Sequence, residues 1–121
     1  MYTISKEFHF CASHVLHGLE EGHPCGRNHG HNYVIIVELA AYDLDKTGFV
    51  EDYGRLKDIK EFIDDKLDHR LLNEIIPGQP SAEVIAKFIF DTFSYVHPHM
   101  SAVHVKETPK TMATYRVESN E

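Results

Sequence analysis

The sequence of 121 residues contains little cysteine, no long hydrophobic run and no cluster of basic residues. Its two cysteines, Cys11 and Cys25, are too few for the disulfide framework of a small secreted domain, so we expect free thiols in a reducing compartment. No run of about 18 apolar residues occurs, and no apolar segment follows a basic start within the first 20 positions. We therefore expect no membrane insertion and no export, and we predict a cytoplasmic protein.

Basic residues are outnumbered, because 12 Lys and Arg face 19 Asp and Glu, which gives a formal net charge of −7. A nucleic-acid partner needs a basic surface to meet its phosphates, so we predict none. The length and the hydrophobic content of 42% suit one compact core, and the chain has neither an internal repeat nor a Gly/Ser-rich linker. We predict a single domain over residues 1–121.

Apolar residues alternate with polar ones over residues 2–15, which predicts a half-buried strand with His14 on its apolar side. Residues 31–42 form a second predicted strand. It is apolar on both faces from Val34 to Val37, which is typical of a strand buried on both sides, and another subunit is one candidate for covering one of these faces. Asp52 is placed to cap a helix with a buried stripe, and Ser81 caps a second one that should end before His97. The two stripes comprise Leu56, Ile59, Phe62, Ile63 and Leu67, and Val84, Ile85, Phe88, Ile89, Phe93 and Val96.

Two further strands are predicted over residues 102–108 and 111–118, joined by a turn at Pro109 and Lys110. Four strands divided into pairs by two helices indicate an α+β domain with an antiparallel sheet. Such a small open sheet has free edges that favour oligomerisation.

The most distinctive segment is "CGRNHGH", which runs from Cys25 to His31. In an extended segment His29 and His31 project to the same side, so both can bind one ion. Two imidazoles hold zinc poorly, and His14 on the inward face of the first strand is the best candidate for a third ligand. Three ligands would leave the fourth position open, as in catalytic zinc sites.

The spacing leaves two roles for Cys25: a fourth ligand that closes the site, or a thiolate base beside it. Cys11 is interpreted as a small packed residue without chemistry. The remaining histidines are interpreted as surface groups or as groups with satisfied hydrogen bonds, among them His9, His17, His97, His99 and His104.

Two polar features interrupt the apolar pattern. Glu107 shares a strand face with Val103 and Val105, so it either reaches solvent at a strand end or accepts two N–H donors from a flat heterocycle. Asp68 and His69 are either an ordinary helix end or a proton shuttle oriented by a carboxylate.

Six blocks of the chain, in order, resemble the 6-pyruvoyl-tetrahydropterin synthase superfamily. They are "FHFCASH", "HPCGRNHGHNY", "GFVEDYGRLK", "LDHRLLN", "PSAEVIAKFIF" and "VKET". The spacing Cys-x-x-x-His-Gly-His resembles the bacterial 6-carboxy-tetrahydropterin synthases of the queuosine pathway, since pyruvoyl synthases typically have a longer gap after the cysteine. The resemblance implies the tunnelling fold, in which ββααββ units form rings that close a barrel. Two stacked rings give a homohexamer, a dimer of trimers, with active sites between subunits.

The resemblance also implies residue roles. His14, His29 and His31 match zinc (Zn²⁺) ligands and Cys25 the proton-accepting base. Asp68 and His69 match a relay supplied by a neighbouring subunit, and Glu107 matches the anchor of the pterin ring and a member of the relay. Ser81 is the matching position for a substrate-binding hydroxyl, although the family block Asn-Pro-Thr reads Gln-Pro-Ser here.

The implied reaction converts 7,8-dihydroneopterin triphosphate and water to 6-carboxy-5,6,7,8-tetrahydropterin, triphosphate and acetaldehyde. Two other interpretations stay open. One is a non-catalytic zinc module closed by Cys25, which should unfold when the metal is removed. The other is a different pterin enzyme of the same fold, such as a pyruvoyl synthase.

Overall fold

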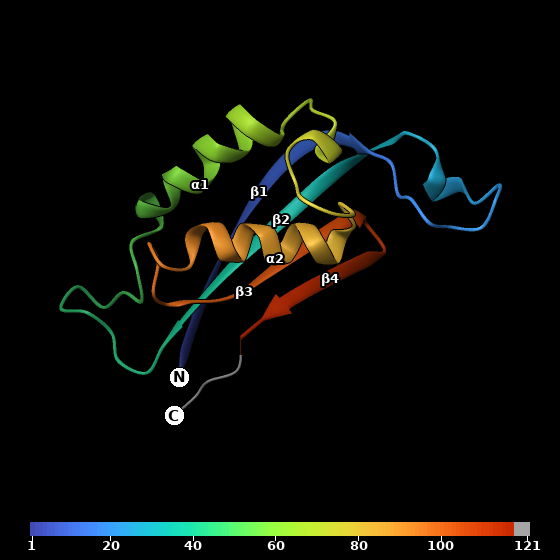
Figure 1. Ribbon diagram of the computed structural model, residues 1–121. Coiled ribbons are helices and arrows are strands. Elements are labelled where there is room, and N and C mark those ends of the chain that lie inside the picture. The colour runs from blue at the N-terminus through green and yellow to red at the C-terminus, as the bar shows by residue number, and fades with distance from the viewer. Residues whose placement is uncertain (118–121) are drawn as a thin grey trace.

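The computed structural model describes residues 1–117 and contains one four-stranded antiparallel sheet with two α-helices on one of its faces (Figure 1). The strands are β1 (Tyr2–His14), β2 (His29–Ala41), β3 (Met100–Thr108) and β4 (Thr111–Arg116), and they lie in the order β1-β2-β3-β4. The helices are α1 (Lys57–Phe62) and α2 (Ala82–Phe93). The α+β prediction and the order ββααββ are therefore confirmed.

Strand β1 follows the predicted alternation, since Phe8, Phe10, Ala12 and His14 are buried. Strand β2 begins two residues earlier than predicted, at His29, and pairs along its whole length with β1. Its odd residues face the helices and are buried from Tyr33 to Ala41, whereas Val34 and Ile36 are half-buried on the opposite face, which we call the helix-free face. Cover of that face by a second subunit stays a prediction.

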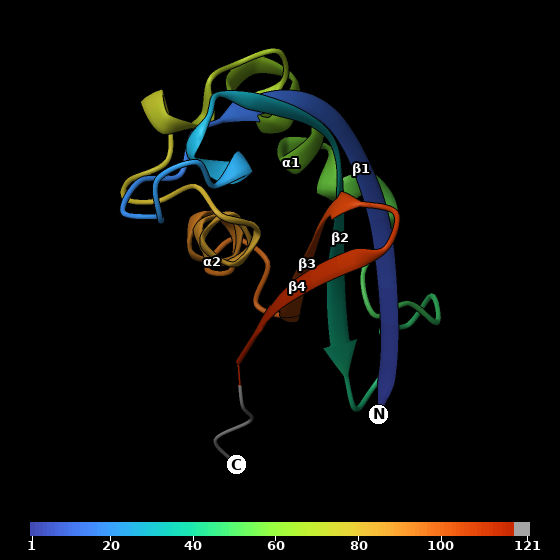
Figure 2. The same ribbon diagram turned by 90° about the vertical axis from the view of Figure 1, so that its right-hand side faces the viewer.

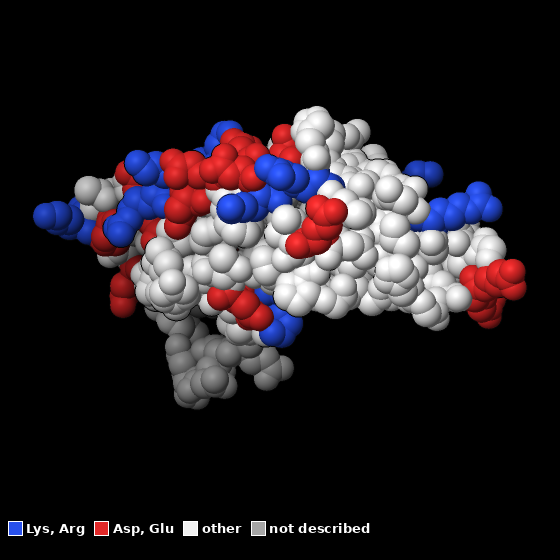
Figure 3. Space-filling view, turned by 45° about the horizontal axis from the view of Figure 1, so that its top comes forward, with Lys and Arg blue, Asp and Glu red and all other residues white. Residues whose placement is uncertain are grey.

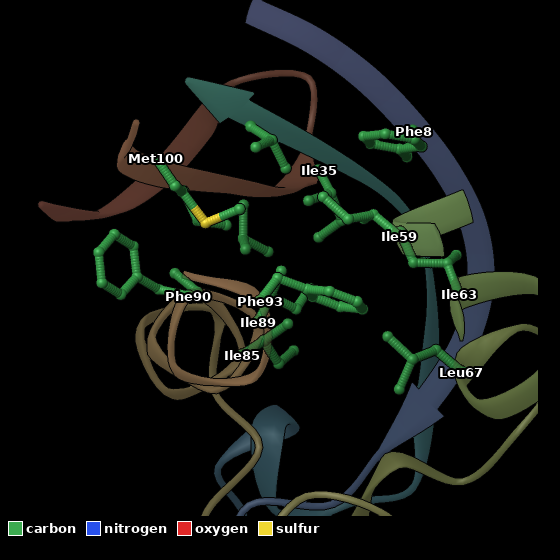
Figure 4. Close-up of a cluster of buried hydrophobic side chains, with 14 of the residues drawn as sticks. Phe8, Ile35, Ile59, Ile63, Leu67, Ile85, Ile89, Phe90, Phe93 and Met100 are labelled. Carbon is green, nitrogen blue, oxygen red and sulfur yellow. The ribbon is translucent and has the colours of Figure 1, made fainter. Parts of the chain in front are cut away.

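The core lies between the concave side of the curved sheet and the two helices (Figure 2). Figure 4 shows Ile59, Ile63 and Leu67 from the first helical segment facing Ile85, Ile89 and Phe93 of α2. Each fully buried aliphatic side chain contributes roughly 1.5–3 kcal/mol to stability. This packing holds α2 against the sheet and so fixes the loop before α2, which contacts the end of β1.

The first helical segment has three consecutive parts: a 3₁₀ turn over Tyr53–Leu56, α1, and a π-helical turn over Ile63–Leu67. Asp52 caps it as predicted, because its side chain accepts a hydrogen bond from the Gly54 N–H at 2.8 Å. No helix within residues 1–117 is long and apolar enough to cross a membrane.

Helix α2 begins as predicted, with the Ser81 hydroxyl accepting from the Val84 N–H at 3.3 Å. It ends at Phe93, and the assignment of Val96 to its buried stripe is wrong: Val96 lies beyond the helix and is 50% exposed. Beyond the helix, buried His97 contacts Glu51, just before the first helical segment, and Asp58 in α1. Strand β4 ends at Arg116, and the predicted end at residue 118 lies outside the described residues.

Charged side chains are unevenly distributed over the surface. Figure 3 shows them gathered over α1, whereas the neighbouring surface toward the loop of residues 15–28 is mostly uncharged. The candidate site lies at this less charged end, where β1 ends and β2 begins.

Candidate metal centre

Three imidazoles meet at the end of the sheet. His14 is the last residue of β1 and faces His29, the first residue of β2, while Ala12 faces His31. Because residues two apart share a face of a strand, all three rings project toward the helix side. One ligand atom from each ring can be chosen so that all three atoms lie within 4.8 Å of one another. The structure thus brings the three predicted ligands into one cluster that could hold a metal ion.

Hydrogen bonds to main-chain carbonyls fix two of these rings. His14 Nδ1 donates to the Pro80 oxygen at 2.7 Å, and His29 Nδ1 donates to the Arg27 oxygen at 2.6 Å. A carbonyl oxygen can only accept, so both Nδ1 atoms carry a hydrogen, and in the neutral form of each ring the Nε2 atom presents a lone pair. An outer hydrogen bond of this kind is usual for metal-bound histidine.

The third ring, that of His31, has a buried Nε2 atom without a hydrogen-bond partner among the described residues. Burial lowers the pKa of His31, although the negative charge of Glu107 opposes this effect. A neutral imidazole with an unpaired nitrogen is the form that binds a metal. The donor set therefore fits a divalent ion that prefers nitrogen ligands, such as zinc.

Cys25 lies outside this cluster. It belongs to a 3₁₀ turn, Pro24–Gly26, in the loop between β1 and β2, and its carbonyl accepts from the Leu16 N–H at 3.0 Å. Its side chain is half-buried and forms no disulfide. Within residues 1–117 the ligand cluster contains imidazoles alone, which favours the open site over one closed by sulfur.

Two further residues lie beside His31 on the inner face. Glu107 Oε2 is 3.7 Å from His31 Nε2. The Tyr33 ring centroid is 5.5 Å from that of His31, and Tyr33 stacks on Phe10 at 4.9 Å. The Tyr33 hydroxyl is buried without a partner among the described residues, and burial, together with the charge of Glu107, raises the Tyr33 pKa. The phenol therefore keeps its proton. Sequence reasoning missed Tyr33, although strand periodicity places it on the same face as His31.

Asp68 and His69 form a pair that is held by the edge of β1. Asp68 Oδ1 accepts from the Cys11 N–H at 3.0 Å, and Asp68 Oδ2 lies 2.9 Å from His69 Nδ1. The Cys11 N–H, and next the His69 side chain, hold the pKa of Asp68 below its usual value. His69 has a positive φ of 58° and donates its N–H to the Cys11 oxygen.

This pair lies at the edge of β1, outside the imidazole cluster. His69 lines a hollow of about 410 Å³, to which His31 also contributes, together with Cys11, Ser13 and Asn32. These three strand residues alternate with buried neighbours, so their side chains project from the helix-free face. The structure thus brings Glu107 to the imidazoles of its own chain and places His69 at the edge of β1, beside side chains of the helix-free face.

The interpretation of Cys11 as a packed residue is wrong, because Cys11 is exposed and its thiol donates to Asn32 Oδ1 at 2.8 Å. Its odd position puts it on the helix-free face, where no helix covers it. The prediction for His97 is confirmed: it is buried, with Nδ1 2.9 Å from Glu51 and Nε2 2.9 Å from Asp58.

Comparisons with known proteins agree over nearly the whole chain. Residues 3–118 match the family described as 6-pyruvoyl tetrahydropterin synthase. The 6-carboxy-5,6,7,8-tetrahydropterin synthase of Haemophilus influenzae is 33% identical, over 96% of this chain and 99% of that protein. The enzyme of the same name from Bacillus subtilis is 30% identical over 95% of this chain and 85% of its own length. The solved structure of Caenorhabditis elegans 6-pyruvoyl tetrahydropterin synthase superposes with a TM-score of 0.84 at 29% identity, over 97% of this chain and 96% of that one.

Proposed function

The chain belongs to the 6-pyruvoyl tetrahydropterin synthase family, and on that premise we propose that it is a zinc-dependent lyase acting on 7,8-dihydroneopterin triphosphate. The products would be 6-carboxy-5,6,7,8-tetrahydropterin, acetaldehyde and triphosphate, with one water consumed, in a cytoplasmic route to queuosine and related 7-deazaguanines. The names of the Haemophilus and Bacillus relatives support this reaction over that of a pyruvoyl synthase. The observation that carries the proposal is the three-imidazole cluster with the Glu107 carboxylate beside it.

His14, His29 and His31 would hold the zinc ion. When bound, zinc supplies Lewis acidity that makes a C–H next to a coordinating substrate oxygen easier to deprotonate. The protein's own contribution is orientation: two of the rings are fixed by the Pro80 and Arg27 carbonyls before any ligand arrives.

Cys25 would act as the base that takes this proton from the substrate side chain. A thiolate serves this role only while it stays off the metal, in agreement with a ligand cluster that lacks the Cys25 sulfur. Its turn is tied to Leu16, two residues after His14, so the thiol and the cluster share one end of the sheet.

Glu107 would bind the pterin ring, because its two oxygens can accept two adjacent N–H donors of the ring edge. Its position 3.7 Å from His31 would place the ring next to the imidazoles. Among residues 1–117 the Ser81 hydroxyl only accepts, from the Val84 N–H at the start of α2, so its proton stays available for a substrate oxygen.

The relay formed by Asp68 and His69 would serve the active site of another subunit. The two residues lie at the edge of β1 of their own chain and do not belong to the imidazole cluster, so a second copy is the natural acceptor for their contribution. This supports a homo-oligomer, with a dimer of trimers as the proposed assembly, and predicts that an isolated monomer is inactive.

The reaction needs no redox cofactor, since the ring gains its two hydrogens from its own side chain. Proton redistribution between side chain and ring allows triphosphate to leave, and cleavage of the remaining side chain then releases acetaldehyde. The direct test is incubation of the zinc-loaded protein with 7,8-dihydroneopterin triphosphate and mass spectrometry of the products. A 6-carboxy pterin with acetaldehyde supports the proposal, a 6-pyruvoyl pterin indicates the pyruvoyl synthase, and unchanged substrate indicates a non-catalytic zinc module.

A further inference from the structure

Two buried side-chain polar atoms have no hydrogen-bond partner among residues 1–117, and both belong to β2. They are His31 Nε2 and the Tyr33 hydroxyl, two residues apart on the same face of the strand. A buried polar group without a partner destabilises the folded chain. Such a cost is tolerated where a ligand supplies the missing partner.

The metal accounts for one of these atoms only. His31 Nε2 belongs to a cluster of three imidazole nitrogens, and a bound ion would be the partner that this atom lacks. The Tyr33 hydroxyl is not part of this ligand set and is an O–H donor without a partner among residues 1–117, so it needs an acceptor of a different origin.

Glu107 is the polar group next to Tyr33. Val34 faces Lys106 across β2 and β3, and one step further along this register sets Tyr33 opposite Glu107. Facing residues of an antiparallel pair have Cβ atoms about 5 Å apart. The Glu107 side chain is 24% exposed where it lies beside His31, so its carboxylate is open to a small ligand.

We propose that Tyr33 is a further ligand-binding residue, whose hydroxyl donates a hydrogen bond to the ring carbonyl of the heterocycle that Glu107 holds. The inference rests on the proposed function. A 2-amino-4-oxo ring edge presents two N–H donors followed by a carbonyl acceptor. Glu107 supplies two acceptors for the donors, and Tyr33 supplies the donor that the carbonyl requires. The residue would thereby select rings that have a carbonyl at this position.

The test compares Tyr33→Phe with the wild type, using 6-hydroxymethylpterin and its 4-thioxo analogue as ligands. The analogue keeps both N–H donors but replaces the carbonyl with a poor acceptor. Calorimetric titration of zinc-free and zinc-loaded protein should show that the wild type binds the oxo ligand about tenfold more tightly than the analogue. Tyr33→Phe should lose most of this preference in both forms of the protein, and Tyr42→Phe, at an exposed position just beyond the far end of β2, should retain it.

Other results would overturn the inference. Equal weakening of both ligands in Tyr33→Phe would mean that the hydroxyl acts through Glu107, and an effect confined to zinc-loaded protein would assign its partner to the metal. A marked fall in the melting temperature of unliganded Tyr33→Phe would reveal a partner within the protein, since removing an unpaired hydroxyl costs little stability. If the wild type binds neither ligand, the proposed pterin chemistry itself fails, whereas binding that depends on Glu107 but not on Tyr33 refutes this inference alone.

Discussion

His14 Nε2 lies 2.8 Å from His29 Nε2, although the other nitrogen of each ring already donates its hydrogen to a main-chain carbonyl. Two lone pairs at this distance repel each other unless a cation lies between them. A shared proton or a metal ion can supply this positive charge. The presence of a third imidazole, that of His31, favours the metal ion. The fold thus prepares the site before the ion binds.

We expect the purified protein to bind one zinc ion per chain and to remain folded when a chelator removes it. The sheet and the hydrophobic core do not include the metal, so its loss should remove only the binding contribution, about 2.7 kcal/mol at a free zinc concentration one hundred times the Kd. Circular dichroism with and without chelator measures whether the metal-free chain stays folded. Unfolding of the metal-free chain would instead indicate a structural zinc module.

Cys25→Ala should retain zinc and lose at least about a hundredfold in turnover, as expected for removal of a general base. Metal analysis and product formation on the same sample separate the two properties. Cys11→Ser is the matched control, because Cys11 projects from the helix-free face and serine keeps a donor toward Asn32. If Cys25→Ala loses its zinc, Cys25 is a ligand and not the base.

Two inactive variants should complement each other. Cys25→Ala retains the relay and His69→Ala retains the thiol, so mixed oligomers would contain some sites with both groups if each site combines two chains. Dissociation and joint reassembly of the variants should restore part of the wild-type rate, whereas each variant reassembled alone should stay inactive. Absence of recovery in verified mixed oligomers would assign both residues to the same chain's site.

Most of the strand pattern could be predicted from the sequence, because burial on one face imposes a strict two-residue period. That period placed His14 on the inner face and paired the His29 and His31 side chains, which suffices to find the metal cluster. The same rule applied to Tyr33 would have added it to the site, but an aromatic residue in an apolar strand is usually part of the core.

The remaining features depend on contacts between distant segments. The side on which Asp68 and His69 lie is set by pairing of this segment with the edge of β1, shown by the bond from the Ser13 N–H to the Arg70 oxygen. No local sequence pattern specifies that this segment pairs with the edge of β1. Likewise, the helical period continues through Val96, yet the helix ends at Phe93 and His97 contacts Glu51 and Asp58, which lie far from it in the sequence.

Glu38→Gln should make stability less dependent on pH in the acid range. The Arg116 guanidinium, at 2.6 Å, is the main cause that holds the pKa of Glu38 below its ordinary value in the folded chain. In the unfolded chain the pKa of a Glu is about 4.3. Between the folded and the unfolded pKa the unfolded chain binds more protons than the folded chain, so the free energy of unfolding rises with pH in this range. This contribution is complete above the unfolded pKa and is lost as the pH falls through the folded one.

Urea unfolding between pH 3 and pH 6 tests this prediction. The variant should lose about 1 kcal/mol at pH 6, where the charged carboxylate also accepts from Ser101, and should approach the wild type in acid. Glu61→Gln, at an exposed position of α1, should leave the wild-type profile unchanged. An identical slope in Glu38→Gln and the wild type would refute the assignment.

The coordination of the bound ion tests the account most directly. Zinc K-edge X-ray absorption of the loaded protein, with and without a bound pterin, measures which atoms surround the metal. We predict nitrogen ligands at about 2.0–2.1 Å from three imidazoles together with oxygen, and an unchanged spectrum for Cys25→Ala. A sulfur shell at about 2.3 Å that persists with the pterin bound and disappears in Cys25→Ala would contradict an open catalytic site.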